Sequence, residues 1–363
     1  MFKLKPYNLL LVGGTFDNLC GKSSKIFTEI KEEIEKTQEF CGCNFCYMNG
    51  GNFQDLIDIK SKINTFDVAI WFAKVSNEQE KIIQDLKKIN KKLLLISSKQ
   101  NLDGKYNINA LIQHALGNKS NLFIEFTKNS NRYYGRVLDP LGNQFSPITD
   151  SMALISQTIA QRVNELLNFT RVGSESCGEA VNAPQDEAFF AVIRQQAEIF
   201  SNLIYGTDKI ERFLGNSSFR CVNGFPSFKQ NDIIFVSRRN LDKSLISMQG
   251  FVAVKKDIGV INYYGNHKPS VDTPIQIMLY NYFNNVRYML HSHVYIKDAP
   301  MTQKPIPCGA IEEFQEIISV YPHQELSNFS INLKGHGSLV LANNVDYLKY
   351  TEYTARPIPE LQF

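Results

Sequence analysis

The sequence lacks a strong excess of either charge, a long apolar run near its start and an even set of cysteines. Its 363 residues include 39 Lys and Arg and 36 Asp and Glu, and the net charge of +3 leaves no basic footprint for nucleic acid. The apolar run that ends at Gly13 is only four residues long, too short for a signal-peptide core or a membrane span. Seven cysteines, an odd number, favour free thiols in a reducing compartment. We therefore expect a cytoplasmic globular protein that binds neither nucleic acid nor a membrane.

Three of the cysteines are close together in FCGCNFC, as Cys41, Cys43 and Cys46. A structural zinc site usually takes four ligands from two spaced pairs, and no second pair follows here. Cys20 completes such a site only if the fold brings it near. Free cysteine also packs as a small hydrophobic side chain, so plain thiols are the favoured interpretation and metal binding stays open.

Short apolar runs alternate with helical patterns over about the first 150 residues, which is typical of βαβ units and a parallel sheet. We expect strands at 8–12, 44–48, 67–73, 92–96 and 122–126. We expect a helix over 77–90 with Ile82, Ile83, Leu86 and Ile89 on its apolar face, a hairpin over 132–145, and a closing helix over 150–167. The prediction is a Rossmann-like or flavodoxin-like α/β domain over 1–168, built on a doubly wound parallel sheet.

Residues 169–188 lack an apolar period and are rich in small and polar side chains, which is typical of a linker. A helix over 189–206 follows, and then a strand-rich region of different character. The sequence therefore predicts a second domain over 189–363.

The stretch LLLVGGTFDNLCGKSSKIF, residues 9–27, is a glycine loop between an apolar strand and a helix. A Walker A loop has four residues between its first glycine and Gly-Lys-Ser, whereas six separate Gly14 from Gly21. The dinucleotide motif GxGxxG also fails, because Gly13 and Gly14 are adjacent. GGTFD resembles the start of the cytidylyltransferase motif, but the His-x-Gly-His element of those enzymes is missing. Two alternatives stay open: a plain turn with a serine N-cap, or a phosphate-binding loop made by Gly13, Gly14, Gly21, Lys22 and Ser23.

Three histidines in the second half have the pattern of a metal site. His291 and His293 alternate in the apolar run VRYMLHSHVYI, so both imidazoles project from one face of a strand. His336 lies between two glycines, which permit close backbone approach. Three neutral imidazoles with an open fourth position are typical of a catalytic zinc site. Paired strand histidines are also found as simple surface residues, so spacing alone leaves both interpretations open.

In order along the chain, residues 189–355 resemble the class II aldolase/adducin family. The segments that carry the resemblance are GNSSFR, IIFVSRRNLDKSLISMQGFVAV, KPSVDTPIQIMLY, HSH, PIPCGAIEEFQEII and HGS. The resemblance implies a class II aldolase-like α/β domain and Zn²⁺, or another divalent metal, held by His291, His293 and His336. It also implies that Asp272 takes the place of the catalytic acid/base glutamate. The residues implied for phosphate or anion binding are Asn216, Ser237, Asn240 and Ser270.

The sequence departs from the family pattern around this site. Asp272 is one methylene shorter than glutamate, Val271 replaces a serine, and Gln276 replaces a histidine. Cys308 lies in the segment between the metal histidines, but the sequence marks no base for it. We expect a packed thiol there.

The resemblance implies a zinc-dependent aldehyde-lyase, or a related epimerase or dehydratase, that acts on a small phosphorylated or anionic hydroxy-carbonyl compound. It also implies a homo-oligomer, with a tetramer favoured. One alternative is a non-catalytic adducin-like interaction module. Another is a nucleotide-handling enzyme whose main activity lies in the N-terminal domain.

Overall fold

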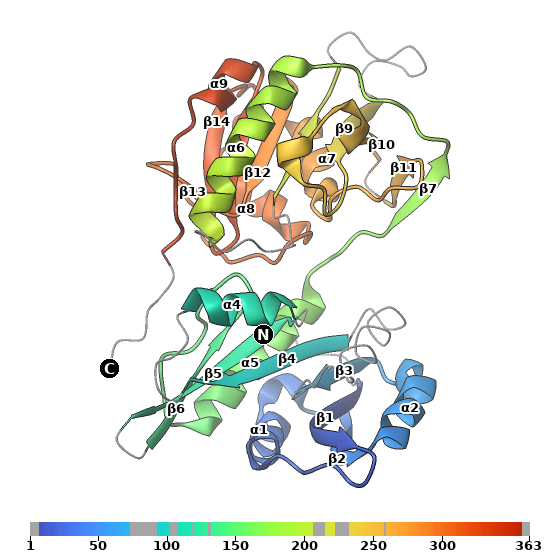
Figure 1. The fold of residues 1–363 in the computed structure, drawn as a ribbon, viewed down its shortest axis with the longest axis vertical. Helices are drawn as coiled ribbons and strands as arrows, with labels where there is room; N and C mark the ends of the chain where they lie inside the picture. The colour runs from blue at the N-terminus through green and yellow to red at the C-terminus, as the bar shows by residue number, and fades with distance from the viewer. Residues whose placement is uncertain are drawn as a thin grey trace. The chain divides into compact units, whose positions relative to one another are not determined.

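The computed structural model describes residues 7–72, 93–101, 108–117, 120–129, 132–205, 215–221, 232–257 and 259–357. The chain divides into two compact units, the first up to Asn168 and the second over Phe169–Pro357 (Figure 1). The helix expected over 77–90 lies outside the described residues. Among the described helices, none combines the length and the apolar character that a membrane span needs.

The first unit is built on a six-stranded sheet in the order β2-β1-β3-β4-β5-β6. The strands are β1 Asn8–Asp17, β2 Asn44–Asn52, β3 Val68–Trp71, β4 Leu93–Gln100, β5 Leu122–Asn129 and β6 Arg132–Leu138. The first five strands in this order are parallel, and β6 pairs antiparallel with β5. The predicted parallel α/β fold is therefore confirmed.

Helices cover both faces of this sheet, because alternate residues of its apolar strands face opposite ways. Leu9 and Leu11 of β1 pack in a core with α1 (Lys25–Lys36) and α5 (Met152–Asn168), whereas Leu10 and Val12 pack with α2 (Phe53–Lys62). α4 (Ile108–Gly117) adds a smaller core against β5 and β6. The sheet is thus doubly wound.

The second unit contains an eight-stranded sheet in the order β14-β15-β12-β8-β9-β10-β11-β7. Its strands are β7 Ser174–Gly178, β8 Asn216–Phe219, β9 Ile233–Ser237, β10 Phe251–Lys255, β11 Ile261–Tyr264, β12 Tyr288–Ser292, β14 Phe329–Leu333 and β15 Gly337–Ala342. β13 (Tyr295–Ile296) and β16 (Tyr353–Thr354) form a separate two-stranded ribbon. Neighbours in the large sheet are antiparallel except for β7 and β11.

Two apolar cores lie on the two faces of the large sheet. One contains side chains of α7 (Thr273–Tyr282) and α8 (Glu312–Val320), and the other contains side chains of α6 (Glu187–Tyr205) and α9 (Val345–Lys349). Ile234 faces the first core and Phe235 the second, as alternation along β9 requires. The sheet is therefore the middle layer of the unit.

Residues 169–188, which the sequence predicts as a linker, include a strand of this sheet. β7 pairs parallel with β11 and belongs to the second unit. Most of its side chains are exposed, because it lies at the sheet edge. An edge strand of this kind has no apolar period, and this explains why the sequence pattern did not reveal it.

Candidate metal centre

Three histidines from two neighbouring strands form one buried cluster. His291 lies on β12, His293 follows that strand directly, and His336 precedes β15, which pairs with β12. One ring nitrogen from each lies within 4.8 Å of the others. The three residues are 3%, 7% and 0% exposed, respectively. The structure therefore brings together the three residues that the sequence suggests as metal ligands.

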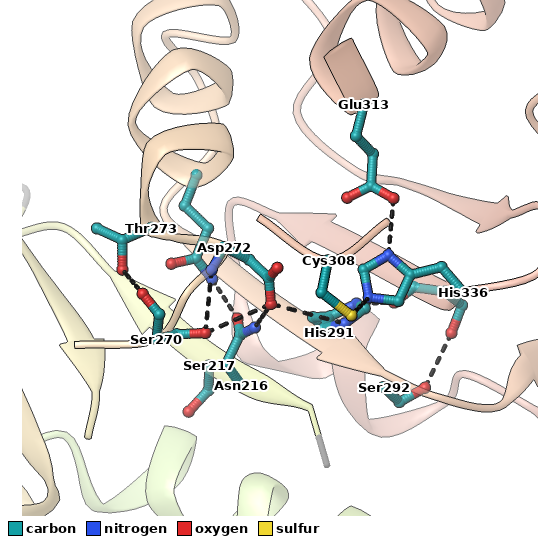
Figure 2. Close-up of polar contacts among 12 residues, drawn as sticks. Asn216, Ser217, Ser270, Asp272, Thr273, His291, Ser292, Cys308, Glu313 and His336 are labelled. Atoms are coloured by element: carbon teal, nitrogen blue, oxygen red, sulfur yellow. Dashed lines mark hydrogen bonds and ion pairs between the residues drawn. The ribbon is translucent and has the colours of Figure 1, made fainter. Parts of the chain in front are cut away.

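Hydrogen bonds fix the orientation of two of these rings. His291 Nδ1 lies 2.9 Å from the carbonyl oxygen of Ser338. His336 Nδ1 lies 2.8 Å from Glu313 Oε1 (Figure 2). A histidine that donates one N–H to a carbonyl or carboxylate presents the other nitrogen as a ligand, and this is the usual arrangement around protein-bound metals. In both rings the nitrogen left over is Nε2.

The cluster carries electron pairs that no protein group uses. Among the described atoms, His291 Nε2 and His293 Nδ1 are buried without a hydrogen-bond partner. Burial, together with the nearby His336, lowers the pKa of His291 to about 4. Burial also holds the pKa of His293 well below its ordinary value. Neutral imidazoles with free lone pairs are the form that binds divalent metals.

His336 has different surroundings. Burial lowers its pKa, but Cys308 and Glu313 act in the opposite direction and bring the net pKa well above the ordinary value. Burial in turn raises the pKa of the Glu313 carboxyl. The ring thus lies between two acidic groups, one at each nitrogen.

Asp272 lies beside the histidines at the start of α7. Its Oδ2 is 4.0 Å from His291 Nε2 and accepts a hydrogen bond of 2.8 Å from Asn216 Nδ2 (Figure 2). Ser270 Oγ donates to the same oxygen at 3.4 Å, and Gln276 Nε2 donates to Asn216 Oδ1. Asp272 Oδ1 is buried without a partner among the described atoms. The carboxylate is therefore held by one oxygen and has the other oxygen unused.

The other two predicted anion-binding residues lie in different settings. Ser237 is fully buried in β9, and its hydroxyl oxygen accepts a hydrogen bond of 3.1 Å from the Ser217 backbone N–H. Asn240 is exposed in the turn after β9, with a positive φ of 57°. The Ser237 hydroxyl oxygen therefore has a structural role, since its hydrogen bond joins β9 to the neighbouring strand β8.

Sequence reasoning missed Glu313 and Lys243 near the histidines, and it expected Cys308 to be a packed thiol. In the structure Glu313 and Cys308 both contact His336. Lys243 is 6% exposed, its Nζ donates to the Leu241 carbonyl, and its charge lowers the pKa of His291 and His293. A doubled glutamate and a lone lysine in a turn give no periodic signal, so only the fold reveals them.

The glycine loop of the first unit holds three backbone segments together. Gly14 has a φ of +76°, and a Cβ there would lie 2.5 Å from the Gly50 backbone nitrogen. Thr15 N–H donates to the Lys22 carbonyl at 2.8 Å. Ser24 caps α1 by accepting from Phe27 N–H at 3.2 Å. These contacts account for the glycines and the serine as structural elements of the loop.

A cavity of about 530 Å³ nevertheless opens beside this loop. Its lining comes from the end of β1, from Phe72 directly after β3, and from β4 and β5. In this sheet β2 lies on one side of β1 and β3 on the other, so the strand order reverses at β1 and β3. Ligands of doubly wound sheets bind at such a point. The lining includes Lys22 and Ser23 beside Phe27 and Phe72.

Among the described residues, Cys41, Cys43 and Cys46 form no metal-ligand group.

The model of a known family matches part of the second unit. Its description is Class II Aldolase and Adducin N-terminal domain, and it covers residues 200–353. No curated protein matches the chain.

Several solved structures are similar at low identity. YgbL from Escherichia coli is 12% identical, with a TM-score of 0.31 over 45% of this chain and 84% of that one. An aldolase II superfamily protein from Pseudomonas syringae is 15% identical, with a TM-score of 0.30 over 45% and 71%. A DNA/pantothenate metabolism flavoprotein from Streptococcus pneumoniae is 12% identical, with a TM-score of 0.30 over 44% and 98%.

The family match includes the three histidines and Asp272. Residues 200–353 of this chain therefore match the model of the Class II Aldolase and Adducin N-terminal domain, in agreement with the resemblance seen in the sequence.

Proposed function

We propose that the second unit is a metal-dependent lyase of the aldolase type, which acts on a small anionic hydroxy-carbonyl compound. The observation that carries this proposal is the histidine cluster, with two buried lone pairs that lack a partner among the described atoms. Leaving buried polar atoms unpaired costs free energy, and a divalent cation relieves that cost for both rings. A donor set of three imidazoles fits Zn²⁺.

The residues divide into ligands and positioning groups. His291, His293 and His336 would hold the ion, with Glu313 orienting the His336 ring. When bound, the ion supplies a Lewis acid that polarises a carbonyl oxygen and stabilises negative charge next to it. Asp272 has the place and the unused oxygen to accept a proton from the substrate carbon beside that carbonyl.

The site also favours a negatively charged substrate. Lys243 is buried near His291 and His293, and its charge acts on both rings. Asn216 and Ser270 add polar side chains around Asp272. These groups favour an anionic substrate, and they are compatible with either a phosphate or a carboxylate.

Metal content and proton exchange test this proposal together. We expect purified protein to bind about one divalent ion per chain, and His291→Ala to lose it because one of three ligands is gone. Deuterium uptake from solvent beside the carbonyl, followed by NMR on a panel of phosphorylated and carboxylated hydroxy-ketones, reports proton transfer without knowledge of the natural substrate. His323→Ala is the matched control, since His323 is exposed and outside the cluster.

If the protein binds no divalent metal when zinc, cobalt or manganese is added, the proposal of a metal-dependent lyase is contradicted. That outcome would favour the non-catalytic adducin-like alternative. Stoichiometric metal without proton exchange on any compound would contradict the proposed reaction but keep the metal site.

We further propose that the cavity of the first unit binds a nucleotide or another phosphorylated molecule. Its volume is within the range of about 300–1,000 Å³ that small-molecule sites occupy, and Lys22 and the start of α1 line it. Titration calorimetry of the full chain with nucleoside triphosphates tests this, with Lys22→Ala expected to weaken binding. Lys25→Ala is the control, because Lys25 is exposed on α1 and outside the lining. Equal affinity in both variants would exclude a role for the loop lysine.

A further inference from the structure

Cys308 is held in a tight turn directly before α8. The Ala310 N–H donates to the Pro307 carbonyl at 3.2 Å, which makes Cys308 and Gly309 the two central residues of a β-turn. Gly309 has a φ of +77°, as the second central residue of a type II turn requires. A Cβ on Gly309 would lie 2.9 Å from the Val271 carbonyl oxygen, so the turn packs closely against the segment that leads into Asp272. The backbone position of Cys308 is therefore fixed by this turn.

The Cys308 thiol contacts Nε2 of His336, the ring nitrogen that does not bond Glu313. Cys308 Sγ is 3.0 Å from His336 Nε2, while His336 Nδ1 is occupied by Glu313 (Figure 2). One hydrogen therefore lies between the sulfur and the nitrogen, whichever of them donates it. A metal ion in the place of that hydrogen is within bonding reach of both atoms.

The distance between these two atoms agrees with ligands that share an ion. With Zn–S of about 2.3 Å and Zn–N of about 2.0–2.1 Å, a sulfur and a nitrogen on one tetrahedral zinc are about 3.5 Å apart. The Sγ–Nε2 separation of 3.0 Å is about 0.5 Å shorter than this value, so the two atoms need to move only slightly apart to share an ion. The group of atoms within 4.8 Å of one another contains only the histidines among the described residues. Coordination by Cys308 therefore needs a rotation of its side chain toward the other two rings.

Two further atoms point to an ion at this place. His291 Nε2 and His293 Nδ1 are each on a residue more than nine-tenths buried, and neither has a partner among the described atoms. The rings of His291 and His336 have centroids 4.7 Å apart, and those of His293 and His336 are 5.0 Å apart. The thiol thus contacts one ring of a close cluster of three imidazoles.

We propose that Cys308 is a fourth protein ligand, so that the centre is three histidines and one thiolate. This inference rests on the proposed metal site of the second unit. When the ion binds, the Cys308 S–H bond breaks, its proton passes to solvent, and a sulfur lone pair forms the bond to the metal; no electron is transferred. A thiolate selects zinc, cobalt and cadmium over magnesium and manganese.

Cobalt spectroscopy on the full chain tests this ligand without an activity assay. We expect Co²⁺ added to the metal-free wild-type protein to give d–d absorption in the visible and thiolate-to-cobalt charge-transfer absorption in the near ultraviolet. Cys308→Ala and Cys308→Ser should keep the d–d bands and lose the charge-transfer band. Cys308→Ser retains a hydroxyl that can contact His336, so folding is preserved. Cys221→Ser, a half-buried cysteine of the same unit, should leave both bands unchanged.

The outcomes separate this inference from the proposed function. Stoichiometric Co²⁺ with d–d bands but no charge-transfer band in the wild type would overturn the thiolate ligand and leave the three-histidine site standing. A charge-transfer band that survives in Cys308→Ser would also overturn it. If the wild type binds no Co²⁺ at all, the proposed function fails with it.

Discussion

Asp272 is one methylene shorter than the glutamate that the family resemblance implies at this position. The sequence alone does not show where the shorter side chain places its carboxylate. The structure places its Oδ2 4.0 Å from His291 Nε2 and ties that oxygen to Asn216 and Ser270. The side chain therefore lies beside the histidines while remaining outside their direct contacts. A carboxylate so placed suits proton transfer better than metal binding.

Asp272→Asn should therefore slow proton exchange and leave metal content unchanged. Removing a general base costs about 10²- to 10⁴-fold in rate, whereas none of the three imidazole ligands is altered. NMR exchange rates and metal analysis on the same preparation measure both quantities. Asp257→Asn, at an exposed position, is the control. Loss of the metal in Asp272→Asn would show instead that the carboxylate is a ligand.

Lys243 gives the protein a pH-dependent stability. Burial lowers its pKa from 10.5 to about 8, with Asp242 and Asp272 acting weakly in the opposite direction. Between these two values the unfolded chain holds a proton that the folded chain has released. The free energy of unfolding therefore rises with pH across this window, by up to about 3 kcal/mol.

Lys243→Met should remove this rise. Urea unfolding at pH 7.5, 9 and 10 measures the free energy of unfolding of both proteins. The difference between wild type and variant at each pH cancels the titration of other groups. Lys297→Met, on an exposed lysine, should follow the wild type. Parallel wild-type and Lys243→Met curves would mean that the lysine keeps its ordinary pKa.

At the scale of elements, the site depends on how closely the turn before β15 approaches β12. Gly337 has a φ of +151°, and a Cβ there would lie 1.9 Å from the Ser292 carbonyl oxygen. No side chain fits between the strand that carries His291 and the turn that carries His336. The glycine after His336 is thus required by both space and backbone conformation.

Gly337→Ala should destabilise the protein and weaken metal binding together. Backbone strain alone costs about 1–3 kcal/mol, and relief of the clash moves His336 away from the other rings. Thermal unfolding and cobalt affinity measure the two effects. Gly173→Ala, where a Cβ meets nothing within 4 Å, should change neither. A stable Gly337→Ala variant with full affinity would show that the turn adapts without cost.

The sequence predicted those parts of the site that depend on local spacing. His291 and His293 alternate along a strand, and the glycines on both sides of His336 indicate that the backbone there closely approaches another segment. The contact between Cys308 and His336 joins residues 28 positions apart, and β7 meets β11 across 87 positions from Ser174 to Ile261. Such contacts depend on tertiary packing, which leaves no local pattern. A serine in a turn motif likewise did not reveal that Ser237 would bond its own sheet.

At the scale of the whole molecule, the metal centre belongs to one unit. The histidines, Asp272, Glu313 and both apolar cores around the large sheet lie within Phe169–Pro357. A unit with its own cores is expected to fold alone. Residues 169–357 expressed by themselves should therefore unfold cooperatively and bind one metal ion.

Circular dichroism and metal analysis of that fragment, beside the full chain, measure this expectation. A fragment that starts at 189 is the control, because it lacks β7 and leaves β11 as the sheet edge. We expect it to be less stable than the longer fragment. If residues 169–357 fail to fold, the first unit contributes to the stability of the second.

β12 is an interior strand, hydrogen-bonded to β15 on one side and to β8 on the other. Its amide hydrogens should be among the slowest in the unit to exchange with water, because they are released only when the sheet opens. His291 is therefore carried by backbone that hardly fluctuates before any ion arrives. The entropy of ordering this ligand is lost during folding, so ion capture proceeds without that penalty and the centre is preorganised by the sheet itself.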